Sequence, residues 1–282
     1  MEVTGSIEQV RSCVKDVRSQ GKSVGFVPTM GALHAGHVSL IKAAKQKCDF
    51  VVVSIFVNPT QFGPDEDFDK YPRPIEKDAA ICEQAGVDLV FNPTASEMYK
   101  AENITWVDVE KLAEHLCGRS RPGHFHGVTT VCAKLFNIAM PDFAFFGQKD
   151  AQQAIIIKRM VADLNMDMEV VICPIVREDD GLAMSSRNKY LSAEQRSQAL
   201  LLHKSLVQGE KLVKEGLRDC AEIKQQMTEI LNESPLISVE YVSIVDIETL
   251  ADVEEITEMA LIALAVKLGQ TRLIDNIIVD VK

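Results

Sequence analysis

Apolar and polar positions along the first 175 residues predict strands and helices in alternation. Residues 24–28 and 50–57 are short, nearly continuous apolar runs, which are typical of parallel strands covered on both faces. Between them, residues 37–48 place their apolar side chains on one side of a helix. Strands that alternate with helices predict right-handed crossovers and a parallel, doubly wound α/β sheet. The same pattern predicts further helices at 75–85, 127–140 and 151–164 and further strands at 88–91, 143–146 and 169–173.

The pattern changes near residue 180. Two helical segments, 193–215 and 221–232, precede apolar runs that have no long helix between them, and consecutive strands of this kind predict an antiparallel sheet. These runs are residues 237–245, 259–267 and 272–281. We therefore expect two domains, an α/β domain at residues 1–178 and a smaller α+β domain at residues 179–282.

Composition and charge narrow the function classes. Of the 282 residues, 46% are hydrophobic and 25% are charged, which is ordinary for a globular protein. The net charge of −11 is a poor electrostatic match for nucleic acid or anionic lipid, so we expect neither as a partner. The longest apolar stretch, 259–266, is too short to span a membrane, and Glu2 stands where a secretory signal would carry positive charge. We expect a cytoplasmic protein whose seven cysteines, none in a CxxC pair, are reduced.

The first expected strand runs into the segment Pro28 to His37 (PTMGALHAGH), where a helix begins. Gly31 and Gly36 have the spacing of a Walker A loop, but His37 occupies the position of the phosphate-binding lysine, which excludes a P-loop NTPase. His34 and His37 instead stand beside the free N–H groups and positive dipole of a helix N-terminus, an arrangement that suits the triphosphate of a nucleotide. Gly36 has no side chain, so a flat ring could lie against the backbone there.

Two other interpretations of these histidines stay open. Each can be an ordinary polar residue at the start of a helix. Alternatively, His34 and His37 can bind a metal together with His124 and His126, although no cysteine or acidic ligand stands at a typical zinc spacing. We rank the metal site below the nucleotide site.

Other polar segments could take part in such a site. Gly147, Lys149 and Asp150 follow an expected strand, where they could bind phosphate and a ribose hydroxyl, or serve only as a helix cap and a solvated lysine. The hydroxyls and guanidinium in residues 184–188 (MSSRN) could close over a polyphosphate, or belong to an ordinary linker. Side chains that could position a carboxylate or hydroxyl substrate, or simply be solvated, are Asn58, Gln61, Arg73 and Gln153.

Five sequence blocks follow one another along the chain: residues 28–37 (PTMGALHAGH), residues 56–63 (FVNPTQFG) with Glu66-Asp67 and Tyr71-Pro72-Arg73, residues 121–125 (RPGHF), residues 147–153 (GQKDAQQ) and residues 185–188 (SSRN). In this order they resemble the pantothenate synthetase (pantoate–β-alanine ligase) family. The resemblance extends from about Gly25 to Leu191, and the closing runs at 264–267 and 272–276 also match. The HxGH motif alone is shared with class I aminoacyl-tRNA synthetases and adenylyltransferases, so the identification rests on the five blocks together.

The resemblance implies a Rossmann-type ATP-binding domain, a small C-terminal domain that acts as a lid, and a homodimer. It implies two half-reactions: pantoate attacks the α-phosphate of Mg·ATP to give pantoyl adenylate and pyrophosphate, and the amine of β-alanine then displaces AMP to form pantothenate. ATP as substrate and Mg²⁺ as cofactor are therefore expected. We also expect the long loop-like stretch at 58–74 to become ordered when pantoate and ATP bind.

The resemblance also assigns residues to these steps. It implies that His37 is a proton donor and that His34 contacts phosphate. Gln61 and Gln153 would hold pantoate, with Gln61 also beside the β-alanine site. The residues that it places around ATP are Met30, Gly31, Ala32, Leu33, His34, Ala35, Gly36, His37, Gly147, Gln148, Lys149, Asp150, Val176, Met184, Ser185, Ser186 and Arg187.

Three alternatives stay open for the function. Another HxGH adenylate-forming enzyme would share the first block. A class I tRNA synthetase-like protein would normally carry lysines where Ser185-Ser186-Arg187 stands, and would need a basic surface for RNA. A non-catalytic nucleotide-binding module would keep its ATP affinity after substitution of the two histidines, whereas a ligase would lose turnover.

Overall fold

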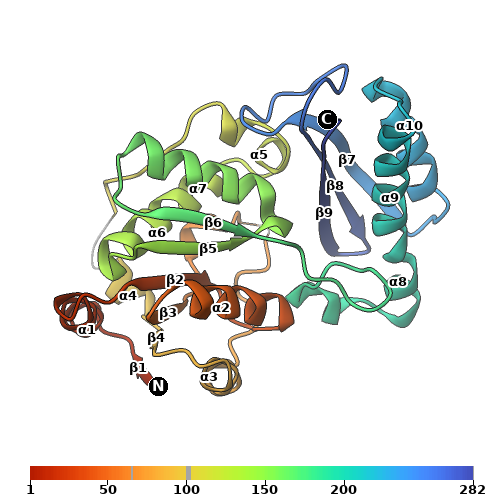
Figure 1. Cartoon of the computed structure of the whole chain (residues 1–282). Coiled ribbons are helices and arrows are strands. Elements are labelled where there is room, and N and C mark those ends of the chain that lie inside the picture. Colours follow the sequence, from red (N-terminus) through yellow and green to blue (C-terminus); the bar gives the residue numbers. More distant parts are fainter. Residues whose placement is uncertain (65, 100–102, 282) are drawn as a thin grey trace.

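The computed structural model describes residues 1–64, 66–99 and 103–281, whose elements form two sheets, each with its own helices (Figure 1). Asp65, which falls within the loop expected at 58–74, lies outside the described residues. None of the helices in the described part of the chain is long and apolar enough to cross a membrane.

The larger sheet consists of six parallel strands. They are β1 (Glu2–Thr4), β2 (Val24–Thr29), β3 (Phe50–Ile55), β4 (Leu89–Phe91), β5 (Phe143–Gly147) and β6 (Glu169–Cys173), in the spatial order β1-β4-β3-β2-β5-β6. The parallel, doubly wound sheet that the sequence predicts is confirmed. The strand order reverses between β2 and β5, and the carboxyl ends of the strands at such a reversal are where ligands bind in sheets of this class.

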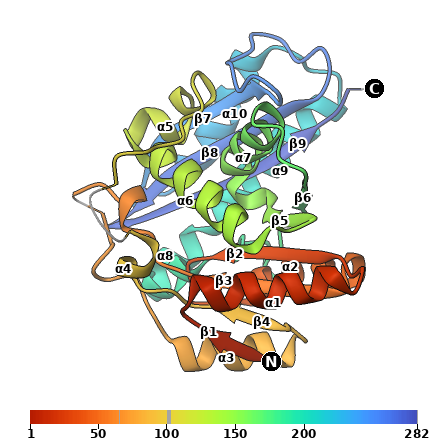
Figure 2. The same ribbon diagram turned by 90° about the vertical axis from the view of Figure 1, so that its left-hand side faces the viewer.

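Helices cover both faces of this sheet. Those on one face are α1 (Ile7–Ser19), α6 (His124–Ala139) and α7 (Ala151–Asp163), and those on the other are α2 (Ala35–Lys47) and α3 (Ile75–Gln84). Successive side chains of a strand point to opposite faces, so Phe26 of β2 packs with the first group and Val27 with the second. Figure 2 shows α1 in front of the sheet, across β2 and β3. Short helices α4 (Ala95–Met98) and α5 (Cys117–Ser120) belong to the connection before α6.

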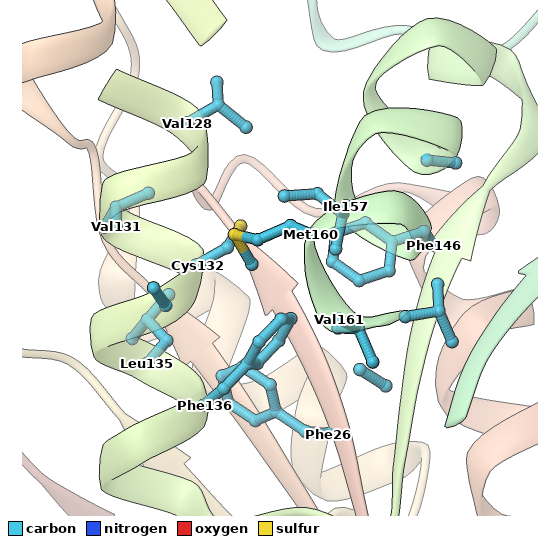
Figure 3. Close-up of a cluster of buried hydrophobic side chains, with 14 of the residues drawn as sticks. Phe26, Val128, Val131, Cys132, Leu135, Phe136, Phe146, Ile157, Met160 and Val161 are labelled. Carbon is cyan, nitrogen blue, oxygen red and sulfur yellow. The ribbon is translucent and has the colours of Figure 1, made fainter. Parts of the chain in front are cut away.

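Helix α6 is buried along most of its length and carries much of the core on its face of the sheet. Phe136 of α6 packs edge to face against Phe26 of β2 and Phe146 of β5, with ring centroids 6.3 Å and 6.4 Å apart. Figure 3 shows Cys132 of α6 meeting Met160 of α7 above the same strands. Contacts of this kind on several sides hold α6 in one position relative to the ends of β2 and β5.

The C-terminal part forms a smaller sheet with helices on one face. Its elements are the helices α8 (Ala193–Gln198), α9 (Leu200–Lys214) and α10 (Cys220–Leu231) and the antiparallel strands β7 (Ile237–Asp246), β8 (Ala260–Leu268) and β9 (Thr271–Val279). The predicted antiparallel sheet is confirmed. α9 and α10 cover one face, whereas Leu261 and Ala263 on the other face belong to the core of the larger sheet. The two sheets therefore pack against each other through shared apolar contacts.

The structure differs from the sequence prediction at several elements. β1 was not expected, because it has only three residues, too few to show an alternating pattern. α1 was not expected either, although its buried Val10, Val14 and Val17 have helical spacing. The helix expected at 193–215 is divided at Ala199 into α8 and α9. Helices α2 and α6 begin before the expected residues 37 and 127, because their N-caps are His34 and Gly123.

Candidate functional site

A cavity of about 220 Å³ lies at the carboxyl ends of β2 and β5, where the strand order reverses. A wider cleft of about 1480 Å³ adjoins it and is bounded on one side by the C-terminal sheet. Residues that line both are Gln61, Lys149, Asp150, Gln153, Ser185 and Arg187. The small cavity is thus reached from the wide cleft.

Most of the residues that the sequence singled out line this cavity. They are Met30, His34, Gly36, His37, Asn58, Gln61, Gly147, Lys149, Asp150, Gln153, Val176, Met184, Ser185, Ser186 and Arg187. They come from the connection between β2 and α2, the connection between β5 and α7, and the segments after β3 and β6. The fold therefore gathers four separate parts of the sequence around one space.

Five residues that the resemblance placed around ATP do not line the cavity: Gly31, Ala32, Leu33, Ala35 and Gln148. Ala32 and Leu33 are buried, and their N–H groups donate to the carboxylate of Asp78. A buried N–H group requires an acceptor, and Asp78 supplies it. The amide of Gln148 donates to Asn276 at 3.3 Å instead of facing the cavity.

His34 and His37 cap the start of α2 reciprocally. His34 is the N-cap residue in an extended conformation, His37 is the third residue of the helix, and both rings line the cavity. Nδ1 of His34 accepts the N–H of Gly36 at 3.1 Å, and Nδ1 of His37 accepts the N–H of His34 at 3.3 Å. The ring centroids are 4.2 Å apart. Both imidazoles are fixed by the backbone that they cap.

Burial keeps both imidazoles neutral. It lowers the pKa of His34 to about 4, with a further contribution from the charge of Lys149, and lowers the pKa of His37 to about 3, with a further contribution from His34. Because each Nδ1 accepts a hydrogen bond, the proton of each neutral ring is on Nε2. Each ring therefore offers one N–H donor to an anion while carrying no charge itself.

Lys149 lies in the turn η3 (Gln148–Asp150) between β5 and α7. No ion pair within the described residues involves Lys149, so its ammonium group is available to an anion. The turn is held from the C-terminal sheet, because Nδ2 of Asn276 on β9 donates to the carbonyl oxygens of Gln148 (2.9 Å) and Lys149 (3.0 Å). Asn276 is only 3% exposed, which makes these bonds important to the position of the turn.

The neighbouring residue on β9 anchors a second segment of the cavity wall. The buried carboxylate of Asp275 accepts two hydrogen bonds from the guanidinium of Arg177, at 2.6 Å and 3.0 Å. Arg177 directly follows Val176, which lines the cavity. Two adjacent residues of the C-terminal sheet thus hold the Lys149 turn and the Val176 segment.

The hydroxyls and the guanidinium expected near ATP lie at the start of the turn η4 (Ser186–Tyr190). Oγ of Ser185 accepts the N–H of Arg187 at 3.2 Å. The guanidinium of Arg187 donates to the carboxylate of Asp67 at 2.9 Å and 3.2 Å, so an anion that approaches Arg187 must compete with Asp67.

Other contacts also connect described residues of the segment 58–74 to the rest of the fold. It contains the short helix η1 (Pro59–Gln61), and Glu66 forms a bidentate ion pair with Arg121. Arg73 donates to carbonyl oxygens of its own segment and does not line the cavity.

The amide of Gln61 has a fixed orientation. Its Oε1 accepts from Nδ2 of Asn58 at 3.1 Å, and its Nε2 contacts the sulfur of Met30 at 3.2 Å. Nδ2 of Asn58 also donates to the carbonyl oxygen of Gly127 at 3.2 Å. Glycine is required at position 127, because a Cβ atom there would lie 2.3 Å from the carbonyl oxygen of Thr60. This close approach of α6 to η1 sets the position of Gln61.

The sequence did not indicate the apolar wall of the cavity. Val128, Val131, Cys132 and Leu135 of α6 form this wall together with Leu40 and Phe56. The apolar character of α6 signals burial, but which of its sides meets a cavity depends on packing. Asp78 was also missed, since an acidic residue in the first turn of a helix is common for reasons of the helix dipole alone.

The two other histidines considered as metal ligands lie apart. Nδ1 of His124 contacts the carbonyl oxygen of Gln61 at 2.8 Å, and burial lowers the pKa of His124 to about 4. His126 stacks on Trp106, with centroids 4.5 Å apart. Within residues 1–64, 66–99 and 103–281, no three His, Cys, Asp or Glu side chains come together to hold a metal ion, so the zinc alternative finds no ligand cluster there.

Comparison with known proteins points to one family. A sequence profile of the Pantoate-beta-alanine ligase family matches residues 2–278. The curated pantothenate synthetase of Pelotomaculum thermopropionicum is 56% identical over 278 residues, which cover 99% of each chain. A solved structure of pantothenate synthetase from Thermus thermophilus matches with a TM-score of 0.94 at 43% identity, over 98% of this chain and 99% of that chain.

A second solved structure has bound ligands. It is the pantoate-beta-alanine ligase from Francisella tularensis, complexed with Beta-gamma ATP and β-alanine. It matches with a TM-score of 0.81 at 35% identity, over 98% of this chain and 97% of that chain. Both similarities extend over the six-stranded sheet and the smaller C-terminal sheet.

Proposed function

This chain belongs to the pantoate-beta-alanine ligase family, and we propose that its 220 Å³ cavity, together with the part of the wide cleft that adjoins it, binds ATP and pantoate. As a member of this family, the chain is an ATP-dependent ligase that forms pantothenate from pantoate and β-alanine. One observation supports placing the reaction here: two neutral, N–H-donating imidazoles and the available ammonium group of Lys149 line the same cavity as two glutamine amides. Donors for phosphate and donors for a hydroxy acid thus share one small volume.

In the first half-reaction a carboxylate oxygen of pantoate attacks the α-phosphorus of ATP. The bond from that phosphorus to the bridging oxygen breaks, and pyrophosphate leaves. Displacement at phosphorus needs positioning and neutralisation of charge more than covalent help from the protein. Lys149, Ser185 and Arg187 would bind the phosphates, and Arg187 would exchange Asp67 for a phosphate oxygen.

His34 and His37 would act in this step as neutral hydrogen-bond donors through Nε2. A histidine whose pKa is about 3, as for His37, carries no second proton to give away at neutral pH. Pyrophosphate leaves as an anion, so the step requires stabilisation of charge and no proton transfer. We therefore propose hydrogen bonding for His37 in place of the proton donation that the resemblance implied.

In the second half-reaction the amine of β-alanine attacks the acyl carbon of the pantoyl adenylate. The bond from that carbon to the phosphate oxygen breaks, AMP leaves with the bonding electron pair, and the attacking nitrogen loses a proton to water. Gln61, oriented by Asn58, and Gln153 would hold the pantoyl group during both steps. The adjoining cleft of about 1480 Å³ would admit β-alanine.

The donor set fits a magnesium ion that is held largely by ATP. Among the described residues that line the cavity, Asp150 is the one carboxylate. Mg²⁺ usually keeps several waters and is bound by one or two carboxylates together with substrate phosphates. Asp150 and the triphosphate would hold the ion, which would neutralise part of the phosphate charge when bound.

Four further expectations, the first and third of them implied by the family resemblance, are proposals of the same kind. Residues 179–282 would act as a lid on residues 1–178, and small-angle scattering with and without ATP tests this. The segment 58–74 would become ordered with ligands, and limited proteolysis tests this. The chain would be a homodimer in the cytoplasm, which sedimentation equilibrium and cell fractionation test.

The reaction is tested with the purified chain, ATP, Mg²⁺ and pantoate whose carboxylate carries ¹⁸O. We expect pantoate alone to support exchange of labelled pyrophosphate into ATP, because the adenylate forms without β-alanine. When β-alanine is added, pantothenate and AMP should appear, and one ¹⁸O atom should be found in AMP. Exchange that does not depend on pantoate, or unlabelled AMP, would contradict the proposed route and favour another adenylate-forming enzyme.

A further inference from the structure

The turn that precedes the two cavity histidines has an unusual backbone. Gly31 has φ +85° and Ala32 has φ +52°, so two consecutive residues take left-handed conformations. Glycine adopts this region without strain, but alanine does so only against the repulsion of its Cβ atom. Interactions from elsewhere in the fold must therefore hold Ala32 in place.

A single buried carboxylate supplies those interactions. Oδ2 of Asp78 accepts the N–H of Ala32, and Oδ1 accepts the N–H of Leu33, both at 2.8 Å. Asp78 belongs to the first turn of α3 and is 1% exposed. Hydrogen bonds to an ionised acceptor are about twice as strong as neutral ones. Both oxygens of one carboxylate thus hold two successive amides of the turn.

The space around this carboxylate admits no larger residue in the turn. A Cβ atom at position 31 would lie 2.9 Å from Oδ2 of Asp78 and 3.1 Å from Cγ2 of Ile55. Gly31 is therefore needed for two reasons, its positive φ and the close approach of the carboxylate.

The position of the turn determines the position of the imidazoles. His34 directly follows Leu33, and its backbone N–H is the donor to Nδ1 of His37. A shift of the turn would therefore move both rings together. Asp78 itself does not line the cavity, so it has no direct contact with a bound ligand there.

We propose that Asp78 is a positioning residue for the reaction: by binding the N–H groups of Ala32 and Leu33 it sets where the imidazoles of His34 and His37 meet the substrate. The proposal rests on the proposed function of those two histidines. Because the N–H groups of Ala32 and Leu33 donate to Asp78, they are not available to phosphate. Phosphate would therefore be bound in this turn by the Nε2 atoms of the two imidazoles.

Asp142 offers a matched control at the opposite end of β2. Its Oδ2 accepts the N–H of Val24 at 2.7 Å, and its Oδ1 pairs with Arg18. Like Asp78, it is a carboxylate that holds backbone next to β2, but it lies at the amino end of the strand and does not line the cavity. Removing its charge should affect stability alone.

The test compares Asp78→Asn with Asp142→Asn. An asparagine at position 78 presents an NH₂ group to one of the two backbone N–H groups, so the turn should shift. We expect kcat/KM for ATP to fall on the order of tenfold or more, with a larger loss in kcat than in binding. The long-range ¹H–¹⁵N spectrum should show moved imidazole signals for His34 and His37. Asp142→Asn should lower the melting temperature and leave the rates and both signals unchanged.

If Asp78→Asn changes only the melting temperature, as Asp142→Asn should, the proposal is wrong. Should Asp78→Asn fail to fold, the double variant Asp78→Asn with Ala32→Gly removes the strain at position 32 and should fold with the same displaced imidazole signals; undisplaced signals would overturn the proposal. The two possible failures can be distinguished, because the imidazole signals do not depend on activity. An inactive wild type would contradict the proposed function, whereas unmoved imidazole signals in Asp78→Asn would contradict the positioning role of Asp78.

Discussion

The walls of the cavity that carry its two kinds of phosphate donor are held in different ways. The imidazole wall is built within the larger sheet, where His34 and His37 cap α2 and Asp78 of α3 holds the preceding turn. The cationic wall, which carries Lys149, depends on the C-terminal sheet. Asn276 of β9 holds the Lys149 turn, and the adjacent Asp275 holds the Val176 segment through Arg177. The neutral donors are thus set by one part of the fold, and the charged donors by contacts between both parts.

This difference suits the chemistry of each wall. A neutral N–H donor acts only at short range and in one direction, so its position must be set locally and closely. An ammonium group acts through its charge over a longer distance, so its position can be set less closely, by contacts with the C-terminal sheet. Substitutions in the C-terminal sheet should therefore move Lys149 and leave the positions of the His34 and His37 imidazoles unchanged.

The largest effect should come from the imidazole wall. Replacing His34 or His37 by alanine removes a donor aimed at phosphate, and we expect kcat to fall on the order of 10² or more. Rapid-quench measurement of pyrophosphate release reports this directly. His126→Ala, which removes an imidazole outside the cavity, should retain nearly full activity. Equal losses in all three variants would show that the wall has no special part in the reaction.

The cationic wall is tested by Asn276→Ala, which leaves the carbonyl oxygens of Gln148 and Lys149 without their donor. We expect KM for ATP to rise about tenfold, with the imidazole signals of His34 and His37 unchanged. Gln152→Ala is the matched control, because Gln152 is also a buried amide that donates to two carbonyl oxygens, at 2.7 Å and 2.9 Å. That variant should lose stability with a smaller effect on ATP. Moved imidazole signals in Asn276→Ala would contradict the conclusion that the C-terminal sheet positions Lys149 without affecting His34 and His37.

A fall in pH should destabilise the folded chain, in part through the two histidines of the imidazole wall. The folded chain holds the pKa of His34 at about 4 and that of His37 at about 3, below the ordinary 6.5. Below pH 6.5 the unfolded chain takes up protons that the folded chain does not, so stability falls as the pH falls, by up to about 1.4 kcal/mol for each pH unit and each imidazole.

This pH dependence is measured by urea unfolding between pH 7 and pH 5. His37→Asn should flatten the dependence, because the variant lacks one of the groups that gain a proton on unfolding. His126→Asn should change it less. An identical slope in wild type and His37→Asn would contradict the buried, neutral state of His37.

The smallest effect concerns Asp67, which competes with phosphate for Arg187. Asp67→Asn weakens the ion pair, and we expect ATP to bind about two- to threefold more tightly, since a partly exposed pair of this kind contributes little energy. Asp69→Asn removes the same charge nearby without touching Arg187 and serves as the control. Titration calorimetry with a non-hydrolysable ATP analogue measures both. Weaker binding in Asp67→Asn would mean that Asp67 positions Arg187 instead of competing for it.

Much of the site could be predicted from short segments of sequence. The HxGH segment, the GQKD segment and the SSRN segment were each recognised by their residue types and by their place after an expected strand or in a polar loop, and each contributes residues to the lining of the cavity. What could not be predicted was how their backbones are held. Asp78 and Asn276 are distant in sequence from the turns that they bind, and nothing in their local pattern indicates a partner.

By itself the sequence determined most of the elements and their order, although not β1 and α1, because the period of apolar residues distinguishes a strand from a helix within a window of about ten residues. It also determined which functional groups are present, since imidazole, ammonium and amide groups are set by residue type. Only the tertiary structure decided which of these groups face the cavity and that His34 and His37 are neutral. Both properties depend on burial and on partners far along the chain, which a local pattern does not contain.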